Sequence, residues 1–501
     1  MSPETLPVVV IGTGPAGATA AVALAEAGHR VVVLESGNGD AGGLLVRAMG
    51  RTIFRKGPGF ERRSQFVSAG DGRASWFHTL MPGGLSNYWT GAVPRFAPED
   101  FDEGARRHER YRWPVTYRDL EPFYQRVERL LRISGTASPA PTLPGSTPAY
   151  PAEVPAAWAA VADAARAHGR AMVPAPLAQG TPWMFARRAT AFNSYVAMIQ
   201  PLVRGSRVEI RLGAHALRLH WDGPASRVTA VTYHDRATRT EHRLEAAAVV
   251  IAAGPLESTR LLLNSTSSDF PTGLGDVSGL LGRFLHDHPQ DVCVVDVERP
   301  VARLPHPLVL TRAPYATSEP LCAASGTLGN RRMFPSDFLL NLTPLPTRGL
   351  GLIVFGTMVP TPENRVTLHH DARDEFGTPL LELHARYDDH SLRTVASLRE
   401  TVEAVLERGG HPGRVRSLVG ELVPGRAVHY GGTVRMHASP EHGVLDGWNR
   451  MHAVRNVVVA DASAFTTGPE KNPTLTAMAL AMRAAERLAT DLARGSFALT
   501  S

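Results

Sequence analysis

The sequence predicts an α/β protein in two parts. One part is a parallel-sheet domain assembled from segments at both ends of the chain, and the other is an α+β domain with a mostly antiparallel sheet. Three observations lead to this prediction. A strand, glycine turn, helix and second strand follow one another from Val8. Buried-strand patterns followed by helical patterns recur at Val249 and Val457. Between them, residues 292–422 contain alternating apolar and polar runs, which are typical of antiparallel strands.

The first elements define the parallel part. Val8–Ile11 is an uninterrupted β-branched run, as expected for a strand that is buried on both faces. Ala16–Ala27 is rich in alanine and predicts a helix that stops at Gly28. Val31–Leu34 predicts a second buried strand. This β–α–β order predicts a parallel sheet covered by helices.

Later segments continue the two-part plan. Trp113–Gly135 predicts a turn and an amphipathic helix, and Val208–Trp221 begins a meander of strands. Ala246–Ser265 predicts a strand, a glycine turn and a helix. Inside the antiparallel part, His390–Gly410 predicts one long helix. Asn472–Leu492 predicts the long helix that closes the parallel part.

The composition excludes several classes of protein. The formal charge is +6, but Lys56 and Lys471 are the only lysines, and the arginines are scattered without a basic run of the kind that binds nucleic acid. Two cysteines in 501 residues fit a reducing compartment. Neither a signal peptide nor an apolar run long enough to span a membrane is visible, so we expect a cytoplasmic protein.

A glycine-rich turn follows the first strand. Gly12, Gly14 and Gly17 match the G-x-G-x-x-G pattern, which is weak alone but stronger here because it lies between a strand and a helix. The free N–H groups at the start of that helix suit a pyrophosphate. Glu35 ends the second strand at the spacing where an acid accepts hydrogen bonds from an adenosine ribose. These residues predict a Rossmann-like dinucleotide site.

The fingerprint itself does not choose between NAD and FAD. An NAD dehydrogenase tends to continue in regular βαβ alternation, whereas here a long glycine-rich region follows the second strand. Strand patterns typical of the dinucleotide domain return only at Val249 and Val457. This discontinuity favours a cofactor that is bound by segments from both ends of the chain.

Six segments together resemble the glucose–methanol–choline (GMC) family of flavin oxidoreductases, and they follow the family order over most of the chain. Within the family they look most like the pyranose oxidase branch, which oxidises sugars and glycosides. The segments are the glycine-rich turn, Met81–Phe96, Val249–Leu263, Gly279–Pro289, Asn364–Asp389, and the C-terminal pair His429–Met436 and Asp461–Ala481.

The resemblance implies an FAD cofactor. Some pyranose oxidases attach FAD through a histidine where this chain has Tyr88, so we expect non-covalent FAD, with Thr90 near the reactive edge of the flavin. The expected cofactor-binding residues are Gly12, Gly14, Pro15, Ala16, Gly17, Glu35, Ser36, Gly83, Gly84, Ser86, Asn87, Thr90, Ala216, Ala253, Gly254, Asp461, Pro473 and Thr474. For Asp461 a purely structural role is the alternative to cofactor binding: its side chain would cap the segment that follows it.

The resemblance also implies two domains. We expect an FAD-binding domain formed by residues 1–105, 190–291 and 423–501. A substrate-binding domain would be formed by residues 106–189 and 292–422.

Alcohol oxidation removes a hydride from carbon and a proton from oxygen, and the proton needs a base of near-neutral pKa. His429 and Asn472 match the family's active-site pair, so we expect His429 to be the base and Asn472 to bind the substrate oxygen. Pro473 suits the first turn of the helix that follows, whose positive N-terminus would face the flavin pyrimidine. Gly431 and Gly432 are expected to let the backbone lie close to the flavin.

The remaining histidines predict no metal site, because the H-x-H of His286 and His288 lacks a third ligand at useful spacing. His437 stands where the family has a small residue, and we favour space-filling over a place in the pocket. A serine hydrolase is disfavoured, because no G-x-S-x-G is present.

These features predict FAD-dependent oxidation of a hydroxyl group to a carbonyl on a carbohydrate-like molecule such as a sugar, glycoside, aminoglycoside or nucleoside. The electron acceptor would be oxygen or another acceptor. Oxidation of an apolar alcohol such as a sterol, or of a small alcohol, stays open. So do an NAD(P)-dependent dehydrogenase and a flavin-holding scaffold without chemistry.

Overall fold

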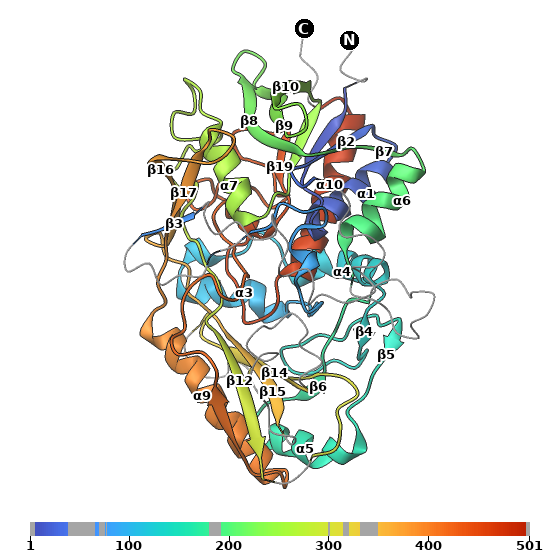
Figure 1. Ribbon diagram of the computed structural model, residues 1–501, viewed down its shortest axis with the longest axis vertical. Coiled ribbons are helices and arrows are strands. Elements are labelled where there is room, and N and C mark those ends of the chain that lie inside the picture. The colour runs from blue at the N-terminus through green and yellow to red at the C-terminus, as the bar shows by residue number, and fades with distance from the viewer. Residues whose placement is uncertain are drawn as a thin grey trace.

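The computed structural model (Figure 1) describes residues 6–38, 66–69, 76, 78–179, 192–298, 301–313, 320–330 and 349–496. The long axis is vertical in Figure 1, with both termini and the parallel strands at the upper end and the antiparallel strands β12, β14 and β15 at the lower end. Most of the glycine-rich stretch expected between Gly37 and Pro94 lies outside the described residues.

The upper half contains a five-stranded parallel sheet in the order β19-β11-β1-β2-β7. Every neighbouring pair is parallel, and Val9 on the central strand lies between Val249 and Val32. The sheet therefore joins strands from both ends of the chain, as the discontinuous pattern predicted. The strands are β1 (Val8–Ile11), β2 (Val31–Glu35), β7 (Val208–Leu212), β11 (Ala248–Ile251) and β19 (Val457–Val459).

Helix α1 (Pro15–Glu26) packs against α10 (Thr474–Ala493), and α10 packs in turn against α4 (Tyr117–Leu131). The residues from Ala16 to Ala25 are all buried and mostly alanine, so the two helices approach closely. Helix α10 is buried around most of its surface, which requires the all-round apolar pattern that it has. These contacts fix the N-terminus of the last helix beside the first glycine-rich turn.

The lower half contains a six-stranded antiparallel sheet in the order β18-β12-β15-β14-β13-β6. Its strands are β6 (Met172–Pro174), β12 (Gln290–Val297), β13 (Leu308–Leu310), β14 (Ala324–Gly329), β15 (Leu350–Gly356) and β18 (Gly413–Ser417). One face packs against α9 (Asp389–Arg408) and α5 (Ala159–Ala167). The other face carries Val292 and Ile353 and faces away from those helices.

Two of the alternating segments form a sheet of their own. β16 (Arg365–Arg373) and β17 (Pro379–His384) pair antiparallel, and β17 pairs parallel with β3 (Phe66–Ser68). They do not join the six-stranded sheet, because α7 and the segment at Arg283 pack beside β16 instead. The antiparallel part thus holds two sheets where the pattern suggested one.

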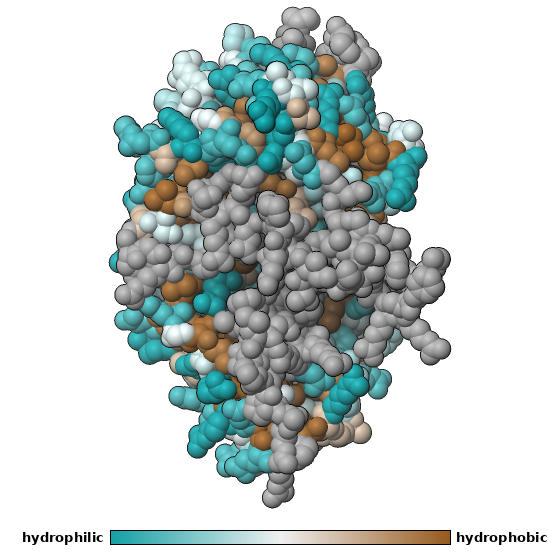
Figure 2. All heavy atoms as spheres, in the orientation of Figure 1, coloured by the Kyte–Doolittle hydropathy of each residue, from teal (hydrophilic) through white to brown (hydrophobic). Residues whose placement is uncertain are grey.

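The predicted meander is confirmed as β8 (Ala214–Asp222), β9 (Arg227–Asp235) and β10 (Thr240–Glu245). Figure 2 shows hydrophilic residues gathered over these strands, where most of β10 is exposed. The remaining elements are β4 (Ser134–Gly135), β5 (Tyr150–Pro151), α3 (Pro98–Arg107), α6 (Gln200–Arg204), α7 (Pro255–Asn264), and the short helices η4 (Gly84–Asn87), η5 (Glu109–Tyr111), η6 (Ala156–Trp158), η7 (Tyr195–Ile199) and η9 (Ala462–Ala464). Among the helices that the structure describes, none combines the length and apolar character needed to cross a bilayer.

Candidate active site

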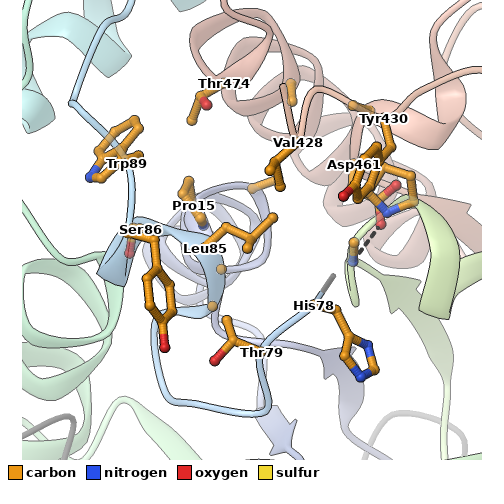
Figure 3. Close-up of a pocket in the computed structure, with 18 of the residues that line it drawn as sticks. Pro15, His78, Thr79, Leu85, Ser86, Trp89, Val428, Tyr430, Asp461 and Thr474 are labelled. Carbon is orange, nitrogen blue, oxygen red and sulfur yellow. Dashed lines mark hydrogen bonds between the residues drawn. The ribbon is translucent and has the colours of Figure 1, made fainter. Parts of the chain in front are cut away.

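A cavity of about 840 Å³ runs from the first glycine-rich turn to the free face of the antiparallel sheet. Figure 3 shows Pro15, Ser86, Val428, Asp461 and Thr474, from five separate segments, around the same hollow. All but three of the residues expected to bind the cofactor line this cavity, and so do His429 and Asn472. The three that do not are Gly17, Gly83 and Asn87.

The glycines of the first turn have distinct structural roles. Gly12 has φ +102°, and a Cβ there would lie 2.4 Å from the Ala252 carbonyl oxygen. A Cβ on Gly17 would lie 2.3 Å from the Gly12 oxygen, so Gly17 lets helix α1 pack on its own turn. A Cβ on Gly14 would meet no atom within 4 Å. Gly14 therefore leaves open space at the N-terminus of α1, which fits an approaching pyrophosphate.

Glu35 closes one side of this cradle. It accepts hydrogen bonds from the backbone N–H of Thr13 at 3.1 Å and of Gly37 at 2.7 Å, and a further one from the Thr13 hydroxyl. Burial raises the pKa of its carboxyl, and these hydrogen bonds oppose the rise. Beside it, the Ser36 hydroxyl lies 2.8 Å from Nδ1 of His215.

Two of the residues that do not line the cavity hold its wall. The backbone N–H of Gly83 donates to the Thr13 hydroxyl at 2.8 Å. The Asn87 amide donates to the carbonyls of Pro82 at 3.1 Å and Gly84 at 2.7 Å. Both residues shape the 83–87 turn from behind, while Gly84 and Ser86 reach the cavity.

Asp461 caps the short helix η9 and also lines the cavity. One carboxylate oxygen accepts from the Ser463 N–H at 2.9 Å, which starts η9, and the other accepts from the Gly254 N–H at 3.1 Å. The second oxygen also accepts from the Ser258 hydroxyl at 2.5 Å. Burial raises the pKa of this carboxyl. Asp461 thus ties β19 to the start of α7 at the cavity wall.

At the far end of the cavity, His429 is bound on both sides of its ring. The Asn472 amide nitrogen lies 3.1 Å from Nε2, and Nδ1 of His288 lies 2.9 Å from Nδ1. Burial moves the pKa of His429 well below 6.5, and the neighbouring His288 adds to this shift. The imidazole is therefore neutral at physiological pH.

His288 determines which nitrogen of His429 carries the hydrogen. Its ring donates to the carbonyl of Pro469, and burial lowers its pKa to about 4. Because Nδ1 of His288 faces His429, the nitrogen that donates to Pro469 is Nε2, so Nδ1 is left as an acceptor. His429 must then donate from its own Nδ1. This leaves the lone pair of Nε2 to accept the hydrogen bond that the Asn472 amide donates.

Asp287 holds the backbone that carries His429. One of its oxygens accepts from the His429 N–H at 2.9 Å, and the other accepts from the Gly425 N–H at 2.9 Å. Burial raises the pKa of this carboxyl to about 7, against the opposing effect of the hydrogen bonds. The turn that it fixes includes Val428 in the left-handed region, at φ 59°.

Asn472 is held by a buried network of charges. The Lys471 ammonium lies 2.9 Å from Asp100 and 3.0 Å from Glu470, and Arg312 donates to Asp100 at 2.9 Å. This network immobilises the residue before Asn472. Asn472, Pro473 and Thr474 then line the cavity where α10 begins.

The free face of the antiparallel sheet forms the opposite wall. Gln290 pairs with Phe355, and Val292 pairs with Ile353, which also pairs with Thr327. All five of these residues line the cavity, because alternate residues of each strand point to this face. The wall is apolar with two polar side chains.

Comparison with known proteins places the chain in a family. Residues 7–281 match the model for an FAD binding domain, and residues 360–481 match the model for GMC oxidoreductase. Paromamine 6'-oxidase of Streptomyces fradiae is 30% identical, over 97% of this chain and 91% of that protein. The chain belongs to the GMC oxidoreductase family. This family assignment confirms the predicted α/β fold and makes FAD the cofactor of this GMC oxidoreductase.

Two further relatives agree. 6'''-Hydroxyparomomycin C oxidase of Streptomyces lividus is 29% identical to this GMC oxidoreductase, over 97% of this chain and 92% of that protein. The crystal structure of pyridoxine 4-oxidase from Mesorbium loti superposes with a TM-score of 0.64 at 21% identity, and covers 96% of this chain and 99% of that one. That structure supports the shared fold.

The sequence analysis of this GMC oxidoreductase missed Asp287 and His288. Both lie in the HDHP segment, which was considered as part of the family segment Gly279–Pro289 and as a possible metal site, but not as support for His429. Within the described part of the chain, no group of three histidine, cysteine, aspartate or glutamate side chains is arranged to hold a metal ion. The available signal was that three adjacent polar residues, His286, Asp287 and His288, stand just before a buried strand, where polar side chains need hydrogen-bond partners.

Gly431 and Gly432 have another role than the one predicted. Neither lines the cavity, and a Cβ on Gly432 would lie 2.3 Å from the Phe284 carbonyl oxygen. A Cβ on Gly431 would lie 2.5 Å from Nε2 of His286. These glycines let the 431–432 backbone pack on the segment before Asp287, rather than on the flavin.

His437 does not line the cavity. It is buried, and it accepts from the Ser439 N–H at 2.9 Å and donates to the Glu109 carbonyl at 3.1 Å. It therefore fills space and joins η5 to its own turn.

Proposed function

We propose that this GMC oxidoreductase oxidises a hydroxyl group of a carbohydrate-like molecule to a carbonyl, with His429 as the base. The observation that carries this proposal is the acceptor nitrogen Nε2 of His429, which lies beside Asn472 at the cavity that the dinucleotide cradle also lines. FAD fits the cradle, because Gly14 leaves space at the start of α1 and Glu35 ends β2 beside it. When bound, FAD supplies the acceptor for the substrate hydride.

His429 takes the hydroxyl proton at Nε2. Its lowered pKa keeps it unprotonated and ready to accept. Once it is protonated, its Nδ1–H remains hydrogen-bonded to His288, which stabilises the imidazolium as it forms. In this structure the Asn472 amide donates to Nε2 of His429. When substrate binds, the amide exchanges this hydrogen bond for one to the substrate oxygen, which orients the hydroxyl toward the base.

The N-terminus of α10 lies at the cavity wall beside Asn472. The first N–H groups of a helix carry partial positive charge, so they stabilise negative charge that develops in the cavity during the reaction. This helix is 20 residues long and buried, which strengthens the effect by excluding water.

The curated relatives reported above are named for oxidation of aminoglycosides, which supports a polyhydroxylated substrate. The apolar residues Val292, Ile353 and Phe355 of the sheet wall can cover the hydrophobic face of a sugar ring, and Gln290 and Thr327 offer hydrogen bonds to hydroxyls. We assign residues 1–105, 190–291 and 423–501 to the FAD-binding domain and residues 106–189 and 292–422 to the substrate-binding domain. Oxygen or another acceptor re-oxidises the flavin.

The test is an anaerobic screen of the purified yellow protein against sugars, glycosides, aminoglycosides, nucleosides, sterols and small alcohols. Bleaching of the flavin absorbance by members of the carbohydrate classes is expected. Bleaching by sterols or simple alcohols alone would contradict the proposal. A colourless protein that turns over alcohols only with a nicotinamide would contradict the flavin assignment itself.

A further inference from the structure

Arg426 is a charged side chain of the cavity wall that has no acidic partner in the described part of the chain. Its Nε is buried and makes no hydrogen bond. Two fully buried arginines elsewhere in the described chain are paired with carboxylates, whereas the half-buried Arg426 is not. Arg95 lies 2.7 Å from Glu128, and Arg312 donates to Asp100 at 2.9 Å.

Three carboxylates line the same cavity, but each already has hydrogen-bond or ion-pair partners, and each lies at the end of the cavity formed by the dinucleotide cradle. Glu35 is held by Thr13 and Gly37 on the β2 side. Asp461 accepts from the Gly254 N–H at the start of α7. Glu257 lies in the first turn of α7 and forms ion pairs with His78 and Arg260. Among the described lining residues, Arg426 is therefore the one formally charged group outside the dinucleotide cradle.

The position of Arg426 places its charge on the substrate side. It lies on the turn that Asp287 holds at Gly425 and His429, three residues from the base. The next residue, Ala427, packs with Val292, Ile353 and Phe355 of the sheet wall. The hydroxyl of Tyr387 donates to the His288 carbonyl at 2.9 Å. Burial raises the pKa of this hydroxyl, and the charge of Arg426 opposes the rise.

We propose that the substrate of this enzyme carries an anionic group, a carboxylate or a phosphate, and that Arg426 binds it. This inference rests on the proposed oxidation and defines its substrate class. A guanidinium binds such groups with two parallel hydrogen bonds, and Arg426, which is half-buried and has no carboxylate partner among the described residues, is free to do so. The same charge repels an ammonium group. The enzyme therefore differs in selectivity from relatives named for aminoglycoside oxidation.

The test measures anaerobic flavin reduction of the holoenzyme with phenyl glucosides whose para substituent is a carboxylate, a phosphate, a hydrogen or an aminomethyl group. The corresponding sugars are glucuronate, glucose 6-phosphate, glucose and glucosamine. We expect at least one anionic series to give a reduction efficiency about tenfold or more above its neutral member, and the cationic members to react most slowly. The carboxylate and phosphate arms identify which anion fits.

Arg426→Gln should abolish the preference for anions, Arg426→Glu should reverse it in favour of the cationic members, and Arg426→Lys should retain it in weaker form. Arg414→Gln, on a side chain that is 87% exposed, is the control and should change nothing. Flavin absorbance and Tm report whether each variant is folded.

Two outcomes would overturn the inference. One is fastest reduction by neutral or cationic members in the parent enzyme, and the other is an anion preference that survives in Arg426→Gln. Both would leave the proposed oxidation standing. Failure of every sugar and glycoside to bleach the flavin would overturn both.

Discussion

The imidazoles of His429 and His288 meet nitrogen to nitrogen, with 2.9 Å between their Nδ1 atoms and 79° between their ring planes. This arrangement resembles the use of a carboxylate behind a catalytic histidine, but here the supporting group is neutral. Because the Pro469 carbonyl takes the single ring hydrogen of neutral His288, the tautomers of both rings are fixed. The position of the base and its protonation state thus depend on the same contact.

Replacing His288 should slow the reductive half-reaction without loss of FAD. For His288→Leu we expect the limiting rate of anaerobic flavin reduction to fall about 10- to 100-fold, as part of the roughly 10²–10⁴ that a positioned base supplies. His288→Gln keeps an oxygen that can accept from His429 and should recover part of the rate. His370→Leu, on a side chain that is 93% exposed, is the matched control. An unchanged rate in His288→Leu would refute the role of this contact.

The pH profile should show a base that works in the acidic range. Burial lowers the pKa of His429 well below 6.5, and the base acts only when it is deprotonated. The acid limb of kcat/KM should therefore lie below pH 6.5, with activity lost only as pH falls through the lowered pKa. Stopped-flow reduction from pH 5 to 8 measures this. A limb at or above pH 6.5 would show that a solvated histidine, or another group, is the base.

Two glycines of the first turn should separate cofactor binding from folding. Gly14→Ala places a methyl group in open space at the N-terminus of α1, so the protein should fold and lose FAD affinity. Gly17→Ala places a methyl group 2.3 Å from the Gly12 oxygen, so stability itself should fall. Titration with FAD and thermal unfolding distinguish the two. Normal FAD affinity in Gly14→Ala would mean that the pyrophosphate does not approach this turn.

Gly432→Ala should destabilise the enzyme more than a left-handed backbone alone explains. Gly432 and Gly410 have nearly equal φ angles, +85° and +83°, but a Cβ meets the Phe284 oxygen at 2.3 Å at the first and nothing within 4 Å at the second. We expect about 1–2 kcal/mol for Gly410→Ala from its conformation. Gly432→Ala should cost clearly more, since packing is disrupted as well. Equal losses in denaturant unfolding would show that the close approach relaxes freely.

Much of the fold follows from local pattern. The βαβ start, the return of buried strands at Val249 and Val457 and the apolar pattern of the last helix were enough to predict a parallel sheet built from both chain ends. The pairing of β17 with β3 was not predictable, because an alternating apolar and polar pattern predicts a strand but does not identify the strand with which it pairs. Sheet membership was therefore the part of the antiparallel region that the sequence left undefined.

The candidate site also has a part that was predictable from the sequence and a part that was not. His429, Asn472 and the first glycine turn each stand in a short sequence motif that can be recognised locally, and the fold brings them to one cavity. Asp287 and His288 act on His429 from more than 140 residues away in sequence, through contacts that only the tertiary structure creates. The role of Gly432 likewise depends on a distant carbonyl, that of Phe284.

The most direct test of the account is the rate of anaerobic flavin reduction in His429→Ala, measured with the best carbohydrate-like substrate of the parent enzyme. We predict a yellow, folded protein whose reduction by substrate is slowed roughly 10²- to 10⁴-fold, while reduction by dithionite is unchanged. A yellow His429→Ala protein that substrate reduces at the parent rate would contradict it.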